Sequence, residues 1–296
     1  MGYRSRTERP KDARRQPSIG AALREAAASL AALPQAAPHL EAMLLLCEAT
    51  GRGYTDLLAR PEAEMPAADR ARFELLLQRR LAGEPIAYIR GRQAFWTLEL
   101  RVTPATLIPR PETELLVELA LERLPAEAPL LVLDAGSGSG AIAAALAHER
   151  PAWTLIATDR GREVTRLVDK NLRRYAPGNA CVINGDWLAP IAERSLHAVV
   201  GNPPYIRDTD PHLGRGDLPW EPRDALAAGP EGLDAIRILS AQATSRLRPG
   251  GFLALEHGCD QGPAVRGIFG RHGFADIRTH RDLSDRERAT TGSLPT

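Results

Sequence analysis

From about residue 113 onward, short apolar stretches alternate with amphipathic ones, and this alternation constrains the fold more than any other feature. The pattern predicts strands at residues 130–136, 154–159, 180–186, 196–202 and 251–258, with helices between them. Strands that are almost wholly apolar and joined through helices form a parallel sheet with both faces covered. The sequence therefore predicts a doubly wound α/β domain that binds its ligands at the carboxyl ends of the strands.

The rest of the chain predicts a second, smaller domain. Residues 18–90 carry apolar side chains at three- and four-residue spacing, which is typical of a small helical bundle. Residues 91–108 contain β-forming residues in alternation and predict a hairpin linker to a catalytic domain at 109–296. Residues 1–17 are basic and nearly free of apolar side chains, so we expect a disordered tail.

Composition excludes several classes of protein. No window holds 18 uninterrupted apolar residues, and the basic start lacks an apolar stretch, so we expect neither a membrane span nor a secretory signal. The cysteines are far apart in sequence, which predicts reduced thiols, a cytoplasmic location and no metal site: Cys47, Cys181 and Cys259. A formal net charge of +1 gives no broad surface for nucleic acid.

The first predicted strand leads into a glycine-rich loop, "DAGSGSGA". Gly136, Gly138 and Gly140 allow backbone angles and close approaches that a Cβ atom would prevent, and Ser137 and Ser139 lie between them. A loop of this kind at the start of a helix binds part of a nucleotide-like ligand. Taken alone it also fits a dinucleotide-binding fingerprint, or a tight turn with no ligand.

The next two strand ends suit the parts of an adenosine. Asp159 lies nineteen residues after Gly140, where an acid accepts hydrogen bonds from ribose hydroxyls, although it could also cap the following helix. Asp186 could accept from the exocyclic amine of adenine. Trp187 offers an apolar ring beside the purine, or is a plain core residue. Together the three strand ends predict a ligand built on adenosine.

The fourth strand ends in "NPPY", residues 202–205, which predicts a clamp for an NH₂ group. The Asn202 side-chain carbonyl and the Pro203 backbone carbonyl can accept the two N–H hydrogens of a planar amide or amine, fixing the nitrogen for attack. Pro203 and Pro204 lock the backbone, and Tyr205 can pack on the planar group. The alternative is a Pro-Pro loop in which Asn202 only forms a turn.

This combination resembles the S-adenosylmethionine-dependent methyltransferases that modify planar amino or amide nitrogens. More specifically, the chain resembles the release-factor glutamine N5-methyltransferase family (HemK/PrmC) over about residues 80–296. The stretches that carry the resemblance are "GEPIAYIRG", "FWTLEL", "LIPRPETELLVE", "DAGSGSG", "NPPYI", "EPRDAL" and "LEHG", of which "PRPETE" (109–114) is the most telling.

The resemblance implies a mainly parallel seven-stranded sheet of the class I methyltransferase type, with S-adenosyl-L-methionine as cofactor. It places the cofactor at residues 136–140, Asp159, Asp186, Trp187 and Asn202. It places the substrate glutamine at residues 202–205, with Phe95 helping to enclose it. The implied substrate is the glutamine of the Gly-Gly-Gln motif in class I peptide chain release factors, recognised by the helical domain. Apart from the resemblance, we expect a monomer.

Other functions stay open from the residues alone. The clamp also fits methylation of adenine or cytosine in nucleic acid, although the near-neutral charge disfavours this. A ribosomal-protein glutamine, a dinucleotide-dependent oxidation and a non-enzymatic binding module are further alternatives. Residues 206–232 are long, polar and rich in Pro, Gly and Asp, which predicts a functional loop over the clamp. Glu256 and His257 look like an acid–base pair, but the mechanism needs none, so we assign them no catalytic role.

Overall fold

The computed structural model describes residues 18–34 and 36–296, which divide into two compact units between Arg90 and Gly91. The predicted tail at 1–17 lies outside the described residues. Each unit is built around a core of its own and is described separately below.

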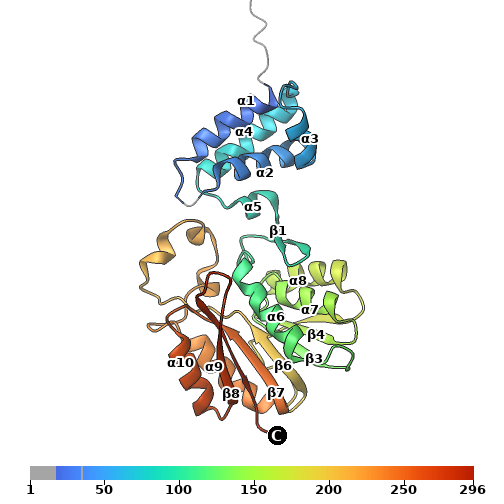
Figure 1. Ribbon diagram of the computed structural model, residues 1–296, viewed down its shortest axis with the longest axis vertical. Helices are drawn as coiled ribbons and strands as arrows, with labels where there is room; N and C mark the ends of the chain where they lie inside the picture. Colours follow the sequence, from blue (N-terminus) through green and yellow to red (C-terminus); the bar gives the residue numbers. More distant parts are fainter. Residues whose placement is uncertain (1–17, 35) are drawn as a thin grey trace, which may run out of the picture. The chain divides into compact units, whose positions relative to one another are not determined.

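The first unit is helical (Figure 1). Ser18 caps the start of helix α1, where its side chain accepts from the Ala21 amide at 3.3 Å, and Gly51, which has a φ of +68°, caps the end of α2. The buried Arg80 side chain binds Glu41 at 2.8 Å and so ties the fourth helix to the second. The helices are α1 (Ile19–Leu30), α2 (Pro38–Thr50), α3 (Tyr54–Ala59), α4 (Ala67–Leu81) and α5 (Ile86–Arg90).

The second unit contains a seven-stranded sheet in the order β5-β4-β3-β6-β7-β9-β8, in which β9 alone runs in the opposite direction to the other six strands. The five predicted strands are present and their ends differ by a few residues from the predicted bounds. The last two strands form an antiparallel pair that the apolar pattern did not reveal. The strands are β3 (Leu131–Ala135), β4 (Thr154–Asp159), β5 (Ala180–Asn184), β6 (Leu196–Gly201), β7 (Leu247–Glu256), β8 (Ala275–Arg281) and β9 (Glu287–Ser293).

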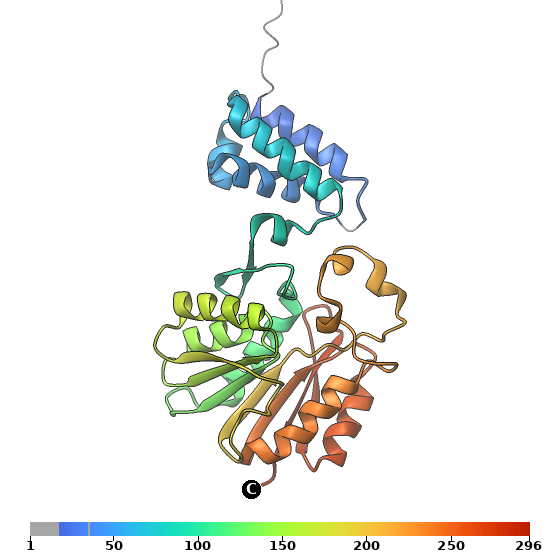
Figure 2. The same cartoon turned by 180° about the vertical axis from the view of Figure 1, so that it is seen from behind.

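Helices cover both faces of the sheet, as the apolar strands predicted (Figures 1 and 2). Successive residues of one strand point to opposite faces, so Val132 packs with one set of helices and Leu133 with the other. One face carries α6 (Glu114–Arg123), α7 (Ala141–Glu149) and α8 (Arg162–Tyr175). The other carries α9 (Asp234–Arg246) and α10 (Gly262–Arg271).

The predicted hairpin exists as β1 (Arg92–Phe95) and β2 (Leu98–Arg101), and it belongs to the second unit. Two side chains of α8 hold it: Asn171 exchanges hydrogen bonds of 2.9 and 3.0 Å with the Arg101 backbone, and the Tyr175 hydroxyl donates to the Glu99 carbonyl at 2.6 Å. The hairpin is therefore part of the packed unit that carries the sheet.

The topology decides where ligands bind. The chain leaves β3 toward β4 on one side and later returns to β6 on the other, so β3 and β6 are adjacent strands whose following loops diverge. Such a switch point forms a crevice at the carboxyl edge of the sheet. The glycine-rich loop follows β3 and the "NPPY" stretch follows β6, so the fold brings the two motifs to the same crevice. The segment between the "NPPY" stretch and α9 contains three short 3₁₀ helices. They are η2 (Pro211–Gly214), η3 (Leu218–Trp220) and η4 (Arg223–Ala225).

Candidate active site

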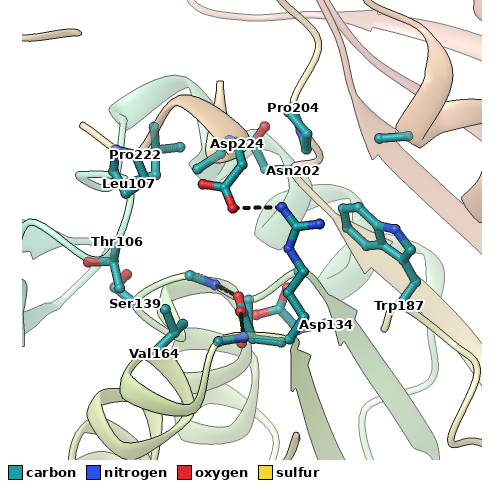
Figure 3. Close-up of a pocket in the computed structure, with 18 of the residues that line it drawn as sticks. Thr106, Leu107, Asp134, Ser139, Val164, Trp187, Asn202, Pro204, Pro222 and Asp224 are labelled. Atoms are coloured by element: carbon teal, nitrogen blue, oxygen red, sulfur yellow. Dashed lines mark hydrogen bonds and ion pairs between the residues drawn. The ribbon is translucent and has the colours of Figure 1, made fainter. Parts of the chain in front are cut away.

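A cavity of about 450 Å³ lies at this crevice, within the second unit (Figure 3). It has the size of a small-molecule site. The loops after β3, β4, β5 and β6 all contribute to its walls, together with residues 105–110 and the segment around η4. Among the predicted site residues, those that line it are Gly136, Ser137, Gly138, Ser139, Asp159, Asp186, Trp187, Asn202 and Pro204.

The glycine-rich loop is shaped by positive φ angles and by a close contact with Trp187. Gly136 has a φ of +71°, and a Cβ atom there would lie 2.5 Å from the Trp187 ring. Gly140 has a φ of +79° and is the residue just before α7, where a Cβ would meet the Val168 side chain at 3.0 Å. A side chain at Gly136 would therefore collide with the Trp187 ring, and one at Gly140 would be strained by the positive φ and tightly packed. The Trp187 ring is half-buried and lies beside the loop in the cavity wall.

Asp159 connects the glycine-rich loop to the loop after β4. Its two carboxylate oxygens accept from the backbone amides of Gly138 at 3.1 Å and Gly161 at 2.9 Å. Burial raises the pKa of the Asp159 carboxyl, while the two amides act in the opposite direction. A carboxylate in the cavity wall retains lone pairs for further donors, such as a pair of ribose hydroxyls. Asp186 lines the same cavity but is exposed.

Asp134 is a site residue that the sequence analysis missed. It is 1% exposed and lines the cavity, and its Oδ2 accepts from the Ala143 amide at 3.0 Å. Its Oδ1 has no hydrogen-bond partner within residues 18–34 and 36–296, and neither has the buried Oγ of Ser137. Burial raises the pKa of Asp134 to about 7. A buried, unpartnered carboxylate oxygen suits a cationic ligand. The acid lies two residues before Gly136, inside the predicted strand 130–136, where the apolar pattern gives it no separate role.

The clamp residues divide into two pairs. Asn202 and Pro204 line the cavity, whereas Pro203 is buried, Tyr205 is half-buried and neither is part of the cavity wall. The Tyr205 hydroxyl donates to Glu256 at 3.1 Å, which directs it into the protein interior. Packing of Tyr205 on a planar ligand therefore stays a prediction. Phe95 differs from the expectation, because it is 1% exposed, lies in the core of the second unit and is absent from the cavity wall.

A buried network lies behind Asn202. The Asn202 Nδ2 donates to the Thr113 hydroxyl at 2.9 Å, and that hydroxyl donates to Glu256 Oε2 at 2.7 Å. Thr113 ends the short helix η1 (Pro111–Thr113) and is 5% exposed, and Glu256 ends β7 and is 1% exposed. Burial raises the pKa of Glu256 to about 7. The network joins three segments that are distant in sequence, so no local motif could have revealed it.

Two ion pairs lie at the cavity mouth, and only the first contains a buried side chain. Glu221 is 6% exposed, accepts from the Ile108 amide at 2.9 Å and binds Arg110, so residues before η1 are attached to those before η4. Arg160 binds Asp224 at 2.6 Å across the cavity, the dashed contact at Asp224 in Figure 3. Both side chains of this second pair are 65% exposed, so solvent screens it strongly.

His257 is separate from this chemistry. It is fully buried, its two ring nitrogens contact the Gly258 carbonyl and the Thr290 hydroxyl at 2.8 Å each, and burial lowers its pKa. Within the part of the chain that the structure describes, no group of three or more His, Cys, Asp or Glu side chains could hold a metal ion. None of the described helices is long and apolar enough to cross a membrane.

Comparison with known proteins supplies the family. Residues 21–91 match the PrmC N-terminal domain and residues 113–214 match the methyltransferase small domain. A release factor glutamine methyltransferase of Pseudomonas aeruginosa is 49% identical over 254 residues, which cover 86% of this chain and 92% of that protein. This chain belongs to the release factor glutamine methyltransferase family. Its relative of the same name in Escherichia coli K12 is 46% identical and covers 91% of this chain and 96% of its own length.

The family membership confirms the predicted fold class, the methyltransferase activity and S-adenosyl-L-methionine as cofactor. A solved methyltransferase from Pyrococcus furiosus, 18% identical with a TM-score of 0.51, covers 74% of this chain and 98% of its own and shares the fold. The cavity fits the cofactor: Asp134 offers an unpartnered carboxylate oxygen to a cation, and Asp159 offers a carboxylate to ribose. The glycine-rich loop has no room for a side chain at Gly136, which keeps the cavity open beside the Trp187 ring.

Proposed function

We propose that this enzyme methylates N5 of the glutamine in the Gly-Gly-Gln motif of class I peptide chain release factors. We further propose that it does so as a cytoplasmic monomer without direct contact with nucleic acid. The observation that carries the proposal is Asn202, which lines the cavity with its Nδ2 bound to Thr113. This leaves Oδ1 as the amide atom available to the N–H group of a substrate. The family relatives, whose printed name specifies release factor glutamine, support the choice of substrate.

The cofactor half of the cavity would hold S-adenosylmethionine by charge and shape. Asp159 would accept from the ribose hydroxyls, Asp134 would face the ammonium group, and the Trp187 ring would lie beside the purine. Asp186 lies at the same wall, where its exposed carboxylate could accept from the adenine amine. When bound, the cofactor supplies an electrophilic methyl group on a sulfonium.

The clamp half would orient the acceptor nitrogen. The lone pair of an amide nitrogen is delocalised, so attack requires the NH₂ group to be held in line with the methyl group and away from bulk water. Asn202 Oδ1 and the Pro203 carbonyl would accept the two N–H hydrogens and stabilise the positive charge that develops on nitrogen. The methylated amide cation is very acidic and loses its proton readily. The buried His257 is therefore not needed as a base.

A methylation assay tests this proposal. The enzyme is incubated with S-adenosylmethionine and an unmodified class I release factor, and the digested product is analysed by peptide mass spectrometry. We expect one added methyl on the glutamine of Gly-Gly-Gln, and none on a release factor carrying asparagine there. Methylation of a ribosomal protein or of RNA in parallel reactions, with an unmodified release factor, would overturn the proposal and retain the methyltransferase activity.

A further inference from the structure

We infer that Thr113 and Glu256 are positioning residues that fix the orientation of the Asn202 amide, so that its carbonyl oxygen and not its NH₂ group points to the substrate. The inference rests on the proposed function, because it concerns how the clamp recognises an NH₂ group. An asparagine amide has a carbonyl on one side and an NH₂ group on the other, and the two are nearly equal in size. Only the carbonyl can accept from a substrate N–H. A clamp built on asparagine therefore needs a device that prevents the amide from turning over.

The number of donor hydrogens on Thr113 and Glu256 prevents the amide from turning over. The Thr113 hydroxyl has a single hydrogen, and an ionised Glu256 has none, so the hydroxyl must donate to the carboxylate, as it does at 2.7 Å. The hydroxyl can then only accept from Asn202, at 2.9 Å, which holds Nδ2 toward Thr113. In the reversed orientation, Asn202 Oδ1 would face an oxygen with no hydrogen to offer. The carboxylate thus sets the direction of both hydrogen bonds.

Burial makes the arrangement rigid. Glu256 and Thr113 are 1% and 5% exposed, so the polar groups exchange little with water and an unsatisfied one is costly. The second oxygen of Glu256 accepts from the Tyr205 hydroxyl at 3.1 Å, three residues beyond Asn202. One carboxylate therefore holds both ends of the stretch 202–205. This explains why an acid lies at the end of β7 although methyl transfer needs no general base.

The same network makes the orientation sensitive to pH. A protonated Glu256 can donate to Thr113, and the hydroxyl is then free to donate to Asn202 Oδ1, which removes the preference for one orientation. Four groups face Glu256: Glu112 and Thr113 from η1, Tyr205 after β6, and Arg288 from β9. Burial outweighs the hydrogen bonds and the Arg288 charge, so the pKa of Glu256 is about 7. We expect turnover at saturating cofactor to fall as pH decreases through that value.

A matched pair of variants tests the role of the hydroxyl. Thr113→Val keeps the shape and removes both hydrogen bonds, whereas Thr113→Ser keeps the hydroxyl. We expect kcat for release-factor methylation to fall roughly tenfold to a hundredfold in Thr113→Val, with calorimetric affinity for S-adenosylmethionine within about twofold of wild type. Thr113→Ser should recover most of the rate. Equal losses in both variants, or an unchanged rate in Thr113→Val, would overturn the inference.

Glu256→Gln tests the role of the charge through the pH profile, which a purely structural role would not change. Its kcat should be lower than that of wild type and should lack the rise through about pH 7. A wild-type profile that is flat between pH 6 and 8, or a Glu256→Gln profile that still rises there, would contradict the inference. This variant also serves if Thr113→Val does not fold.

A measurement without substrate separates this inference from the proposed function. In protein labelled with ¹⁵N-asparagine, the side-chain amide of Asn202 is identified by its absence in Asn202→Ala. We expect its two proton shifts to titrate with Glu256 in wild type and to be independent of pH in Glu256→Gln. If the chemical shifts of these protons do not change with pH in wild type, the inference about the network is wrong, even if the release factor is methylated. Shifts that titrate without methylation of the release factor would reject the proposed substrate alone.

Discussion

The two halves of the cavity are built in opposite ways. In the cofactor half, Asp159 binds backbone amides 2 and 21 residues away, and Asp134 binds one 9 residues away. In the clamp half, Asn202 binds a side chain 89 residues away, which in turn binds one 143 residues away. Backbone amides of strand-to-helix turns, held within 21 residues of their acceptors, form the cofactor half from neighbouring loops. Side chains from three segments form one only when the whole sheet is folded.

This difference predicts that the halves can be impaired separately, and the largest effect should come from the clamp. In the proposed clamp, Asn202→Ala removes the side-chain acceptor for an N–H group of the reacting nitrogen. We expect turnover to fall by about a hundredfold to a thousandfold, a loss comparable to that of a catalytic hydrogen-bond partner. Cofactor affinity, measured by calorimetry, should stay within a few-fold of wild type. A parallel loss of cofactor affinity would show that the two halves are not independent.

The reverse separation should follow from Asp159→Ala. In the proposed cofactor site the ribose hydroxyls would lose a charged acceptor, and the Gly138 and Gly161 amides lose the one they have. At about 1.5–3 kcal/mol per charged hydrogen bond, affinity for S-adenosylmethionine should fall by roughly tenfold to a hundredfold. Asp186→Ala is the matched comparison, since that carboxylate is exposed and should matter less. Calorimetry that ranks Asp186 above Asp159 would reverse the assigned roles.

We expect the buried Asp134 to make the stability of the cofactor-free enzyme depend on pH. Its pKa is raised from 3.8 to about 7, so its stabilising contribution is complete below about pH 4 and is lost as pH rises through 7. Asp134→Asn removes this buried charge and keeps an acceptor for the Ala143 amide. Without cofactor, we expect the variant to be more stable than wild type by about 1–3 kcal/mol at pH 8, with no such gain at pH 4. Urea unfolding at both pH values tests this, and equal differences would refute it.

The smallest effect should come from the ion pair across the mouth. Arg160 and Asp224 are 65% exposed, and exposed pairs contribute about 0–1 kcal/mol. Arg160→Ala should leave thermal stability nearly unchanged and should alter cofactor affinity by only a few-fold. A large loss in either measurement would indicate that the pair is part of the site itself.

The fold could be predicted to a large extent, because the five apolar strands and their helices carry their own periodicity. The pair β8 and β9 escaped the pattern, since its residues are mainly polar, half-buried or exposed and include Arg278 and His280. The cofactor half was likewise visible, since glycines before a helix and acids at strand ends have local reasons to be there. Asp134 was missed because an acid inside a predicted strand has no distinguishing local pattern.

The sequence by itself determined the α/β architecture and the glycine-rich loop and located the "NPPY" stretch at the end of a strand, because each depends on neighbouring residues and on backbone conformation. Only the tertiary structure decided that Phe95 is buried in the core and that Thr113 and Glu256 lie behind Asn202. Those relationships arise where β6, β7 and η1 come together, through side chains that no local rule connects. Local sequence governs the backbone, whereas the direction of a buried hydrogen bond depends on the distant group that completes it.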